Sequence, residues 1–377
     1  MPTVDVENVR IPLELLSRIA DAAGLVDRER RYPRTSLEGL GAAGMLGLSV
    51  PAEHGGAGGG LSALGEACEA VGGACASTGM TYLMHLVTAA TVAGGGGERA
   101  GELLGAFASG EALGTLAFSE RGTGAHFYAP ELRAEPAGEG RVRISGRKSF
   151  VTSGGEADVY LVLVQSADGE GADCFAIERD APGVSFDGSW DGLGMAGNSS
   201  IAMTLDGVEV GDETRIGAPS AAGDLVFGVV APWFLVGLAA VNVGIAAAAQ
   251  QVAVDHAAGR GYADGSTLAD VQAIQHQLAD MDLAVRQARL LVREAAALGD
   301  AGDPDALVPI MEAKVAATDA ARDVTQAALE VSGGQGYTPA LPIERHLRDA
   351  RAGAVMAPTN GVLRSWIGKA LAGLPVP

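Results

Sequence analysis

The sequence predicts an α+β chain with a helix-rich start, a strand-rich middle and a bundle of long helices at the end. Apolar side chains recur every three or four residues between residues 13 and 23, which is typical of an amphipathic helix. Apolar and polar residues alternate at 141–145, and a short apolar run at 159–164 indicates a buried strand. Helical spacing returns between residues 274 and 291. The expected boundaries are residues 1–112, 113–222 and 223–377.

The first part is expected to be helical with glycine-rich joints. Residues 39–44 (GLGAAG) match the G-x-G-x-x-G fingerprint of dinucleotide-binding proteins. That fingerprint follows a strand, whereas a polar segment that starts a helix precedes it here, so we expect no nucleotide site there. A turn-rich loop follows at 50–58, and then a pair of helices broken at Gly72 and Gly73. The second helix of the pair carries His85.

The strand-rich part contains two polar segments next to predicted strands. Residues 117–124 (AFSERGTG) come first, and residues 146–158 (GRKSFVTSGGEAD) directly precede the apolar run at 159–164. Gly, Ser and Thr are typical of turns and loops. The two segments are therefore either ordinary hairpin connections or a place where backbone and hydroxyl groups hold a ligand.

The third part is expected to be an up-down bundle of long antiparallel helices. Residues 226–249 are apolar on all sides and long enough to raise the question of a membrane span. Because this stretch is rich in Ala and Gly and continues into an amphipathic helix, we expect a buried core helix and no membrane partner. The expected helices span residues 226–259, 268–298, 309–331 and 359–371.

Charge and cysteine content narrow the possible functions. The chain of 377 residues has a formal net charge of −20, which argues against nucleic acids and anionic membranes as partners. Its three cysteines, Cys68, Cys75 and Cys174, form no metal-binding or disulfide pattern. An odd number of cysteines fits a reducing compartment, and the start lacks the basic-then-apolar pattern of a signal peptide. We therefore expect a cytoplasmic protein without a metal site.

Three short segments near the C-terminus are the most informative part of the chain. They are residues 330–337 (EVSGGQGY), 343–351 (IERHLRDAR) and 356–361 (MAPTNG). A helix is expected to end at Gly333 and Gly334, where the backbone can turn and approach a ligand without a Cβ in the way. Another helix is expected to begin at Pro358–Thr359, because Pro suits the first helical position.

These segments, in this order, resemble the C-terminal motifs of the acyl-CoA dehydrogenase family, and residues 117–124 and 146–158 resemble motifs of its middle domain. The resemblance covers nearly the whole chain. It implies an N-terminal helical domain, a middle β-barrel or sandwich domain and a C-terminal four-helix bundle, with FAD held between the subunits of a homotetramer or homodimer. The residues implied to bind the cofactor are Phe118, Ser119, Gly124, Phe150, Thr152, Arg260, Glu330, Gly333, Gly334 and Thr359.

The chain departs from the family pattern at the positions that remove the substrate proton and bind the thioester arm. Ala357 stands where the family has the Glu that removes the substrate α-proton, and Ala has no proton acceptor. Ala125 and His126 replace a Ser–Asp pair whose Ser helps to bind the CoA thioester arm. Arg260 lies one residue out of register with the family's FAD-binding Arg, so a surface Arg is an equal alternative. The candidate replacement bases are His85, Glu120 and His126, and a structurally satisfied histidine is the alternative for His85.

The resemblance implies an FAD-dependent oxidoreductase that desaturates an acyl thioester, bound to CoA or to a carrier protein, with a non-standard base. Two alternatives stay open: a flavin-dependent monooxygenase of the same fold that uses reduced flavin and O2, and a catalytically silent flavoprotein subunit. The implied partners are the thioester or another small-molecule substrate, and an electron-acceptor flavoprotein or a flavin reductase. A general base contributes about 10²–10⁴-fold to a rate, so the base decides between these functions.

Overall fold

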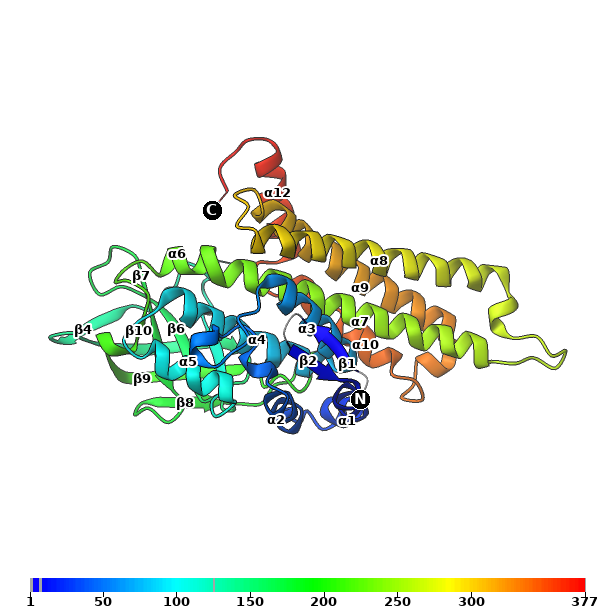
Figure 1. Ribbon diagram of the computed structural model, residues 1–377, viewed down its shortest axis with the longest axis horizontal. Coiled ribbons are helices and arrows are strands. Elements are labelled where there is room, and N and C mark those ends of the chain that lie inside the picture. The colour runs from blue at the N-terminus through cyan, green and yellow to red at the C-terminus, as the bar shows by residue number, and fades with distance from the viewer. Residues whose placement is uncertain (1–2, 7–8, 125, 377) are drawn as a thin grey trace.

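The computed structural model describes residues 3–6, 9–124 and 126–376. The strands between residues 114 and 216 lie at one end of the long axis, and three long helices run to the other end (Figure 1). The shorter N-terminal helices lie against the middle of the molecule, between these two parts. The three-part order predicted from periodicity is therefore the order that the structure has.

The N-terminal part begins with a hairpin that the sequence did not predict, in which strands β1 and β2 pair antiparallel. Helix α1 buries Leu15, Ile19, Ala23 and Val26, which recur every three or four residues along one face. Helix α4 is buried along most of its length, because the other helices and the first strand of the middle part surround it. The elements are β1 (Thr3–Val6), β2 (Val9–Pro12), α1 (Leu13–Arg28), α2 (Arg34–Ala42), α3 (Leu61–Ala74), α4 (Ala76–Gly95) and α5 (Ala100–Ser109).

The middle part consists of two four-stranded sheets. One has the order β10-β7-β6-β3, with β3 parallel to β6, and the other has the order β4-β5-β9-β8. In β5 the predicted alternation holds, because Val142 and Ile144 are buried while Arg141 and Arg143 are exposed. The strands are β3 (Gly114–Ala117), β4 (Ala134–Gly138), β5 (Arg141–Val151), β6 (Val159–Gln165), β7 (Ala172–Glu178), β8 (Val184–Asp187), β9 (Ile201–Gly211) and β10 (Arg215–Ile216).

The C-terminal part is built on three long helices, α7, α8 and α9, with α12 packed against α9. The predicted end at Gly333 appears as a kink, since Gly333 has φ 53° and ψ −138° and the helical run continues to Gly336. The helices are α6 (Ala222–Leu225), α7 (Ala231–Gly259), α8 (Gln272–Asp300), α9 (Leu307–Gly336), α10 (Ile343–Asp349), α11 (Ala352–Val355) and α12 (Asn360–Leu371), with a π-helical turn at Val226–Val230 that joins α6 to α7.

The apolar helix α7 is a core helix. The run Ala222–Gly259 is long and apolar enough to cross a membrane, but 67% of its most apolar window is buried inside the protein. It packs against α9 on one side and α3 on the other. The contact with α3 is backbone on backbone, because a Cβ built at Gly244 would lie 2.2 Å from the carbonyl oxygen of Glu69. Small residues therefore set the distance between the N-terminal part and the bundle.

Candidate functional site

The two polar segments of the middle domain are joined to each other. The loop after β3 carries Phe118 and Ser119, and β5 carries Ser149 next to Lys148. The backbone N–H of Ser149 donates to the Ser119 carbonyl at 2.8 Å. The Lys148 ammonium lies 3.4 Å from the Phe118 carbonyl oxygen. The structure thus brings together the segments in which ring-binding residues were predicted.

A buried ion pair holds this junction. The Lys148 Nζ donates to the Glu120 Oε1 at 2.5 Å and to the Leu163 carbonyl of β6 at 2.5 Å, and both charged side chains are buried. The other Glu120 oxygen accepts the backbone N–H groups of Glu131 and Leu132 at 2.8 and 3.0 Å. The expectation that Glu120 acts as a base is therefore wrong, because both carboxylate oxygens already bind structural donors. Sequence reasoning missed Lys148 as its partner, 28 residues away.

Phe150 is presented to the outside by an irregularity in β5. The pairing of β5 with β9 shifts register between Lys148 and Val151, and Phe150 has a positive φ of 52°. Bulges of this kind redirect a side chain and are frequent beside active sites. The Phe150 side chain is 71% exposed, and its ring meets the Trp190 ring edge-on with the centroids 6.4 Å apart. The resemblance implies that Phe150 forms a wall of the flavin site, and this role stays a prediction.

Thr152 and its neighbours form a polar, partly unsatisfied floor beside Phe150. The Thr152 Oγ1 lies 3.2 Å from the Ser200 Oγ, and its carbonyl accepts from Thr115 Oγ1 at 2.8 Å. Asn198 is 1% exposed, and neither atom of its side-chain amide has a partner among the described residues. Buried amide groups are normally hydrogen-bonded, so this pair of atoms suits a ligand that donates and accepts. The residues here fit the polar edge of a flavin ring.

The second set of predicted cofactor residues lies elsewhere on the chain. Arg260 is exposed at the end of α7, and Glu330, Gly333 and Gly334 are exposed at the end of α9. A Cβ built at Gly333 or Gly334 would meet no atom within 4 Å. In Figure 1 these helix ends lie at the opposite end of the long axis from the strands. One chain therefore does not bring the two sets together, and a site that uses both needs two chains.

His85 is a structural residue. It is 1% exposed, its Nε2 lies 3.0 Å from the Leu46 carbonyl oxygen, and its Nδ1 accepts the backbone N–H of Gly114 at 3.1 Å. Because Nδ1 is an acceptor, Nε2 carries the proton and donates to Leu46. Burial lowers the pKa of His85 to about 4, which keeps the ring neutral. The expectation that His85 acts as an acid or base is wrong, and the satisfied histidine is what the structure has.

His126 is the one candidate base with an exposed side chain. The polar segment that contains it continues into an aromatic cluster, and the neighbouring Ala125 lies outside the described residues. The His126 ring meets the Tyr128 ring edge-on with the centroids 5.7 Å apart. Tyr128 in turn packs against Phe227, at 5.1 Å, and Trp366, at 6.2 Å. His126 therefore lies at the outer side of a cluster that joins the β domain to α12.

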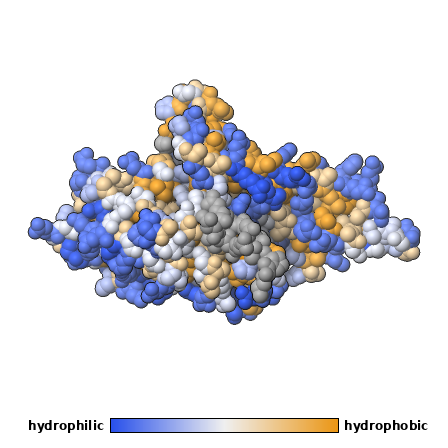
Figure 2. Space-filling view, in the orientation of Figure 1, coloured by the Kyte–Doolittle hydropathy of each residue, from blue (hydrophilic) through white to orange (hydrophobic). Residues whose placement is uncertain are grey.

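An apolar cavity lies beneath this aromatic cluster. Its free volume is about 20 Å³, close to the room that one water needs, so its side chains nearly fill it in this conformation. Gathered apolar side chains are also visible from outside over α12 (Figure 2). No acid or base is among the lining residues, which are Phe127, Phe227, Ala231, Leu235, Leu307, Met311, Pro358, Trp366 and Val376.

The turn at residues 357–360 forms one wall of this cavity and begins the last helix. Pro358 lines the cavity, and Ala357 beside it is partly buried. Thr359, predicted as a cofactor residue, caps α12 by accepting the Val362 backbone N–H at 3.4 Å. Ala357, which stands where the family pattern has a carboxylate, therefore lies next to a residue that lines this apolar cavity.

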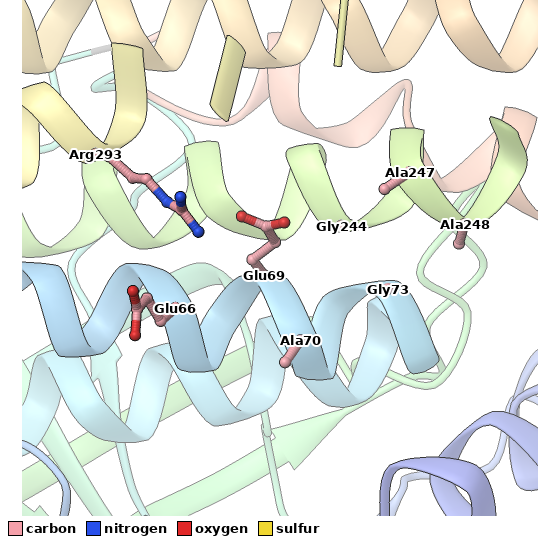
Figure 3. Close-up of a pocket in the computed structure, with 8 residues that line it drawn as sticks. All are labelled: Glu66, Glu69, Ala70, Gly73, Gly244, Ala247, Ala248 and Arg293. Atoms are coloured by element: carbon pink, nitrogen blue, oxygen red, sulfur yellow. The ribbon is translucent and has the colours of Figure 1, made fainter. Parts of the chain in front are cut away.

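A larger hollow lies between α3, α7 and α8, away from every predicted site residue (Figure 3). It has a volume of about 460 Å³ and is lined by small residues together with Glu66, Glu69 and Arg293. Glu69 is already paired with Arg289 at 2.7 Å. Because this hollow is wide open and contains none of the motif residues, it is not part of the candidate site.

The chain matches known proteins along its whole length. Family models match in order: "Acyl-CoA dehydrogenase, N-terminal domain" at residues 15–111, the middle domain at 115–208 and the C-terminal domain at 236–372. The mitochondrial short-chain specific acyl-CoA dehydrogenase of Bos taurus is 32% identical over 347 residues, which are 91% of this chain and 83% of that protein. The cyclohex-1-ene-1-carbonyl-CoA dehydrogenase of Geobacter metallireducens is 32% identical over 358 residues, covering 94% and 93%.

A solved structure agrees with these matches. The butyryl-CoA dehydrogenase of Megasphaera elsdenii superposes with a TM-score of 0.89 at 27% identity, and the match covers 96% of this chain and 97% of that one. The motifs, the three-part architecture and the sequence relatives therefore lead to the same assignment. This chain belongs to the acyl-CoA dehydrogenase family of flavin-dependent oxidoreductases that act on CH–CH bonds.

Proposed function

We propose that this protein desaturates an acyl thioester between its α and β carbons, with His126 as the base in place of the missing carboxylate. The observation that carries the proposal is the closed apolar cavity beside Pro358, with an exposed imidazole at the outer side of its aromatic rim. The lining is apolar, as an acyl group requires, but the free volume of about 20 Å³ holds no more than one water, so substrate binding needs the lining side chains to move apart. Of the three candidate bases, His126 alone has a side chain that is neither buried nor fixed by structural donors and acceptors.

The chain's residues have separate tasks in this reaction. FAD, when bound, accepts the β-hydride of the substrate. Phe150 would cover one face of the ring, and Thr152 with Asn198 would bind its polar edge. His126 would take the α-proton on a ring nitrogen and release it to solvent, for which its exposure is an advantage. The apolar lining would exclude water from the acyl group and keep the α-carbon close to the base.

The test is anaerobic reduction of the flavin by butyryl-CoA in a stopped-flow instrument. His126→Gln is expected to slow flavin bleaching by about 10²–10⁴-fold, the usual contribution of a general base, with little change in KM. The matched control is His276→Gln, on the exposed surface of α8, which should behave as wild type. Ala357→Glu should restore the usual carboxylate and make the rate insensitive to His126→Gln. A His126→Gln rate within twofold of wild type would exclude this base.

A second function is favoured by the lining of the cavity. None of its nine lining residues accepts a proton near neutral pH, and a flavin monooxygenase needs no base for an α-proton. In that function a separate reductase would supply reduced flavin, and O2 would be the oxidant. Oxygen uptake that requires substrate and a supplied flavin reductase would identify it, whereas anaerobic bleaching by a thioester would identify the dehydrogenase. Activity in neither assay, with flavin bound, would leave the silent flavoprotein subunit.

We also propose that FAD is shared between two subunits, and the separation of the two sets of predicted residues supports this proposal. The exposed Arg260 and Gly333 of one chain would bind the part of FAD that extends from the ring site of another. Gly334→Val should therefore lower the flavin content of the purified protein without unfolding it, because no atom lies within 4 Å of the added Cβ and Gly334, unlike Gly333, has no positive φ. Unchanged flavin content, or a monomeric protein that retains FAD, would contradict the shared site.

A further inference from the structure

Lysine is rare in this chain, and its positions are unusual. It occurs three times among the 26 basic residues, at Lys148, Lys314 and Lys369. Two of the three are completely buried, while the exposed basic residues other than Lys369 are arginines or histidines. Lysine is among the residues least often buried without a partner. Lys148 has Glu120 as its partner, which leaves Lys314 to be explained.

The Lys314 ammonium binds the turn that lines the apolar cavity. Lys314 lies in the first third of α9 with 0% exposure, and its Nζ donates to the Pro358 carbonyl at 3.1 Å and to the Asn360 Oδ1 at 2.8 Å. The Asn360 amide is held in turn by Thr318 on the next turn of α9, at 2.8 Å. Among the described residues no carboxylate lies within ion-pair distance of Lys314, so its partners are neutral oxygens of the turn.

This contact connects three walls of the cavity. Pro358 lines it directly, Met311 lines it from α9 one helical turn before Lys314, and Trp366 lines it from α12, which begins at Asn360. Lys314 therefore ties the turn and the start of α12 to the helix that carries another wall. A shift of the turn would move Ala357, Pro358 and Trp366 together.

The surroundings of Lys314 disfavour the protonated form of its amine. Burial lowers its pKa to about 7, while Asp319 on α9 opposes this effect and Arg364 on α12 adds to it. Asp319 is itself bound to Arg322, Arg364 and the Asn360 amide. A neutral lysine amine still has two N–H donors for its two oxygen acceptors. A guanidinium always remains charged and needs more space and more acceptors, so arginine is a poor substitute here.

We propose that Lys314 is a positioning residue for the substrate cavity: it fixes the turn at residues 357–360 through two hydrogen bonds and thereby sets the position of the cavity wall and of Trp366. The proposal rests on the proposed function only in taking this cavity as the place where substrate binds. It assigns Lys314 no contact with substrate or flavin.

The first test observes the lysine side chains directly. Protein labelled with ¹³C at lysine Cε gives three lysine signals, which Lys314→Met and Lys369→Met assign. The Lys314 signal should titrate within about one unit of pH 7, because burial lowers the pKa of this amine. Asn360→Ala, which removes one acceptor, should move the Lys314 midpoint. A Lys314 signal that titrates with that of Lys369, or one that ignores Asn360→Ala, would overturn the proposal.

The second test uses binding and turnover of butyryl-CoA from pH 5.5 to 9 with flavin-replete protein. Lys314→Met should lower kcat/KM by about 10–100-fold, the effect of displacing a site by roughly 1 Å, and should remove any inflection that follows the Lys314 titration. Lys314→Arg should fail to restore the activity, and Lys369→Met should match wild type. His126 packs on Tyr128, which in turn contacts the cavity residue Trp366. The pH profile is therefore repeated in His126→Gln, so that any inflection caused by His126 is excluded.

The outcomes separate the two proposals. A wild-type pH profile and affinity in Lys314→Met, or full activity in Lys314→Arg, would show that Lys314 does not position the cavity. If Lys314→Met does not fold, Asn360→Ala must reproduce the loss of affinity for the proposal to stand. If wild-type protein binds no butyryl-CoA, that substrate is excluded, and the lysine titration with Asn360→Ala still decides the role of Lys314.

Discussion

The buried pair Lys148–Glu120 gives the most quantitative prediction for this protein. Replacing Glu120 by Gln keeps the shape of the side chain but leaves the Lys148 ammonium without a counter-charge at a completely buried position. Removing one partner of a buried ion pair costs about 3–5 kcal/mol. The amide oxygen of Gln can still accept both backbone N–H groups, which bind the same Glu120 oxygen, but the amide NH2 group would then face the Lys148 ammonium. We therefore expect the free energy of unfolding to fall by about 3–5 kcal/mol, and by more for Glu120→Ala.

Urea denaturation at fixed protein concentration measures this loss. The control is Glu209→Gln, which removes a pair between β5 and β9 in which Arg143 and Glu209 lie 2.6 Å apart but are about half exposed. Such a surface pair contributes about 0–1 kcal/mol. The double variant Glu120→Gln/Lys148→Met should lose less than the sum of its single variants, because neither charge is then left alone. A loss below about 1 kcal/mol for Glu120→Gln would refute the view that this pair holds the ring-binding segments together.

Three further predictions concern buried groups and close packing. The pKa of Lys314 is lower in the folded chain than in the unfolded chain, so the unfolded chain holds more protons between about pH 7 and 10. The free energy of unfolding should therefore rise with pH in this range, by up to about 1.4 kcal/mol per pH unit. Lys314→Met should remove this slope from denaturation curves measured across the range. Burial raises the pKa of Asp349 to about 6, so the folded chain holds more protons between about pH 4 and 6; stability should fall with rising pH there, and Asp349→Asn should flatten that fall. Gly244→Ala should lower the free energy of unfolding by at least about 1–3 kcal/mol because it forces α3 from α7, whereas Gly259→Ala, at the open end of the same helix, should not.

The architecture could be predicted because it follows local patterns. The three-and-four spacing of Met281, Val285 and Ala288 identified α8, and the alternation of Val142 and Ile144 identified β5. The β1–β2 hairpin was not predicted, because strands of four residues are too short to show a clear alternation of apolar and polar residues. The sequence predicted that α9 ends at Gly333, whereas the structure has a kink there. Glycine marks a break in a helix, but it does not show whether helical hydrogen bonding resumes after the break.

The candidate site was only partly predictable, because its decisive contacts join residues far apart in the sequence. His85 was a plausible base until Leu46 and Gly114 were seen to occupy its two nitrogens. Glu120 was a plausible base until Lys148 and two backbone donors were seen around it. The role of Lys314 had one sequence signal, its rarity, but only the fold brings it to Pro358 and Asn360. Motifs identified the segments of the site, and tertiary contacts decided what each side chain in them does.

The distribution of the three lysines has a practical consequence. In the folded protein Lys369, near the end of α12, has the only accessible ε-amine, since Lys148 and Lys314 are completely enclosed. An amine-reactive dye should therefore label the native chain at Lys369 and at the α-amino group, and a lysine-specific protease should first trim the C-terminal tail. Slow incorporation at the other two lysines would report transient opening of the β domain or of the bundle, each through its own peptide in a mass spectrum.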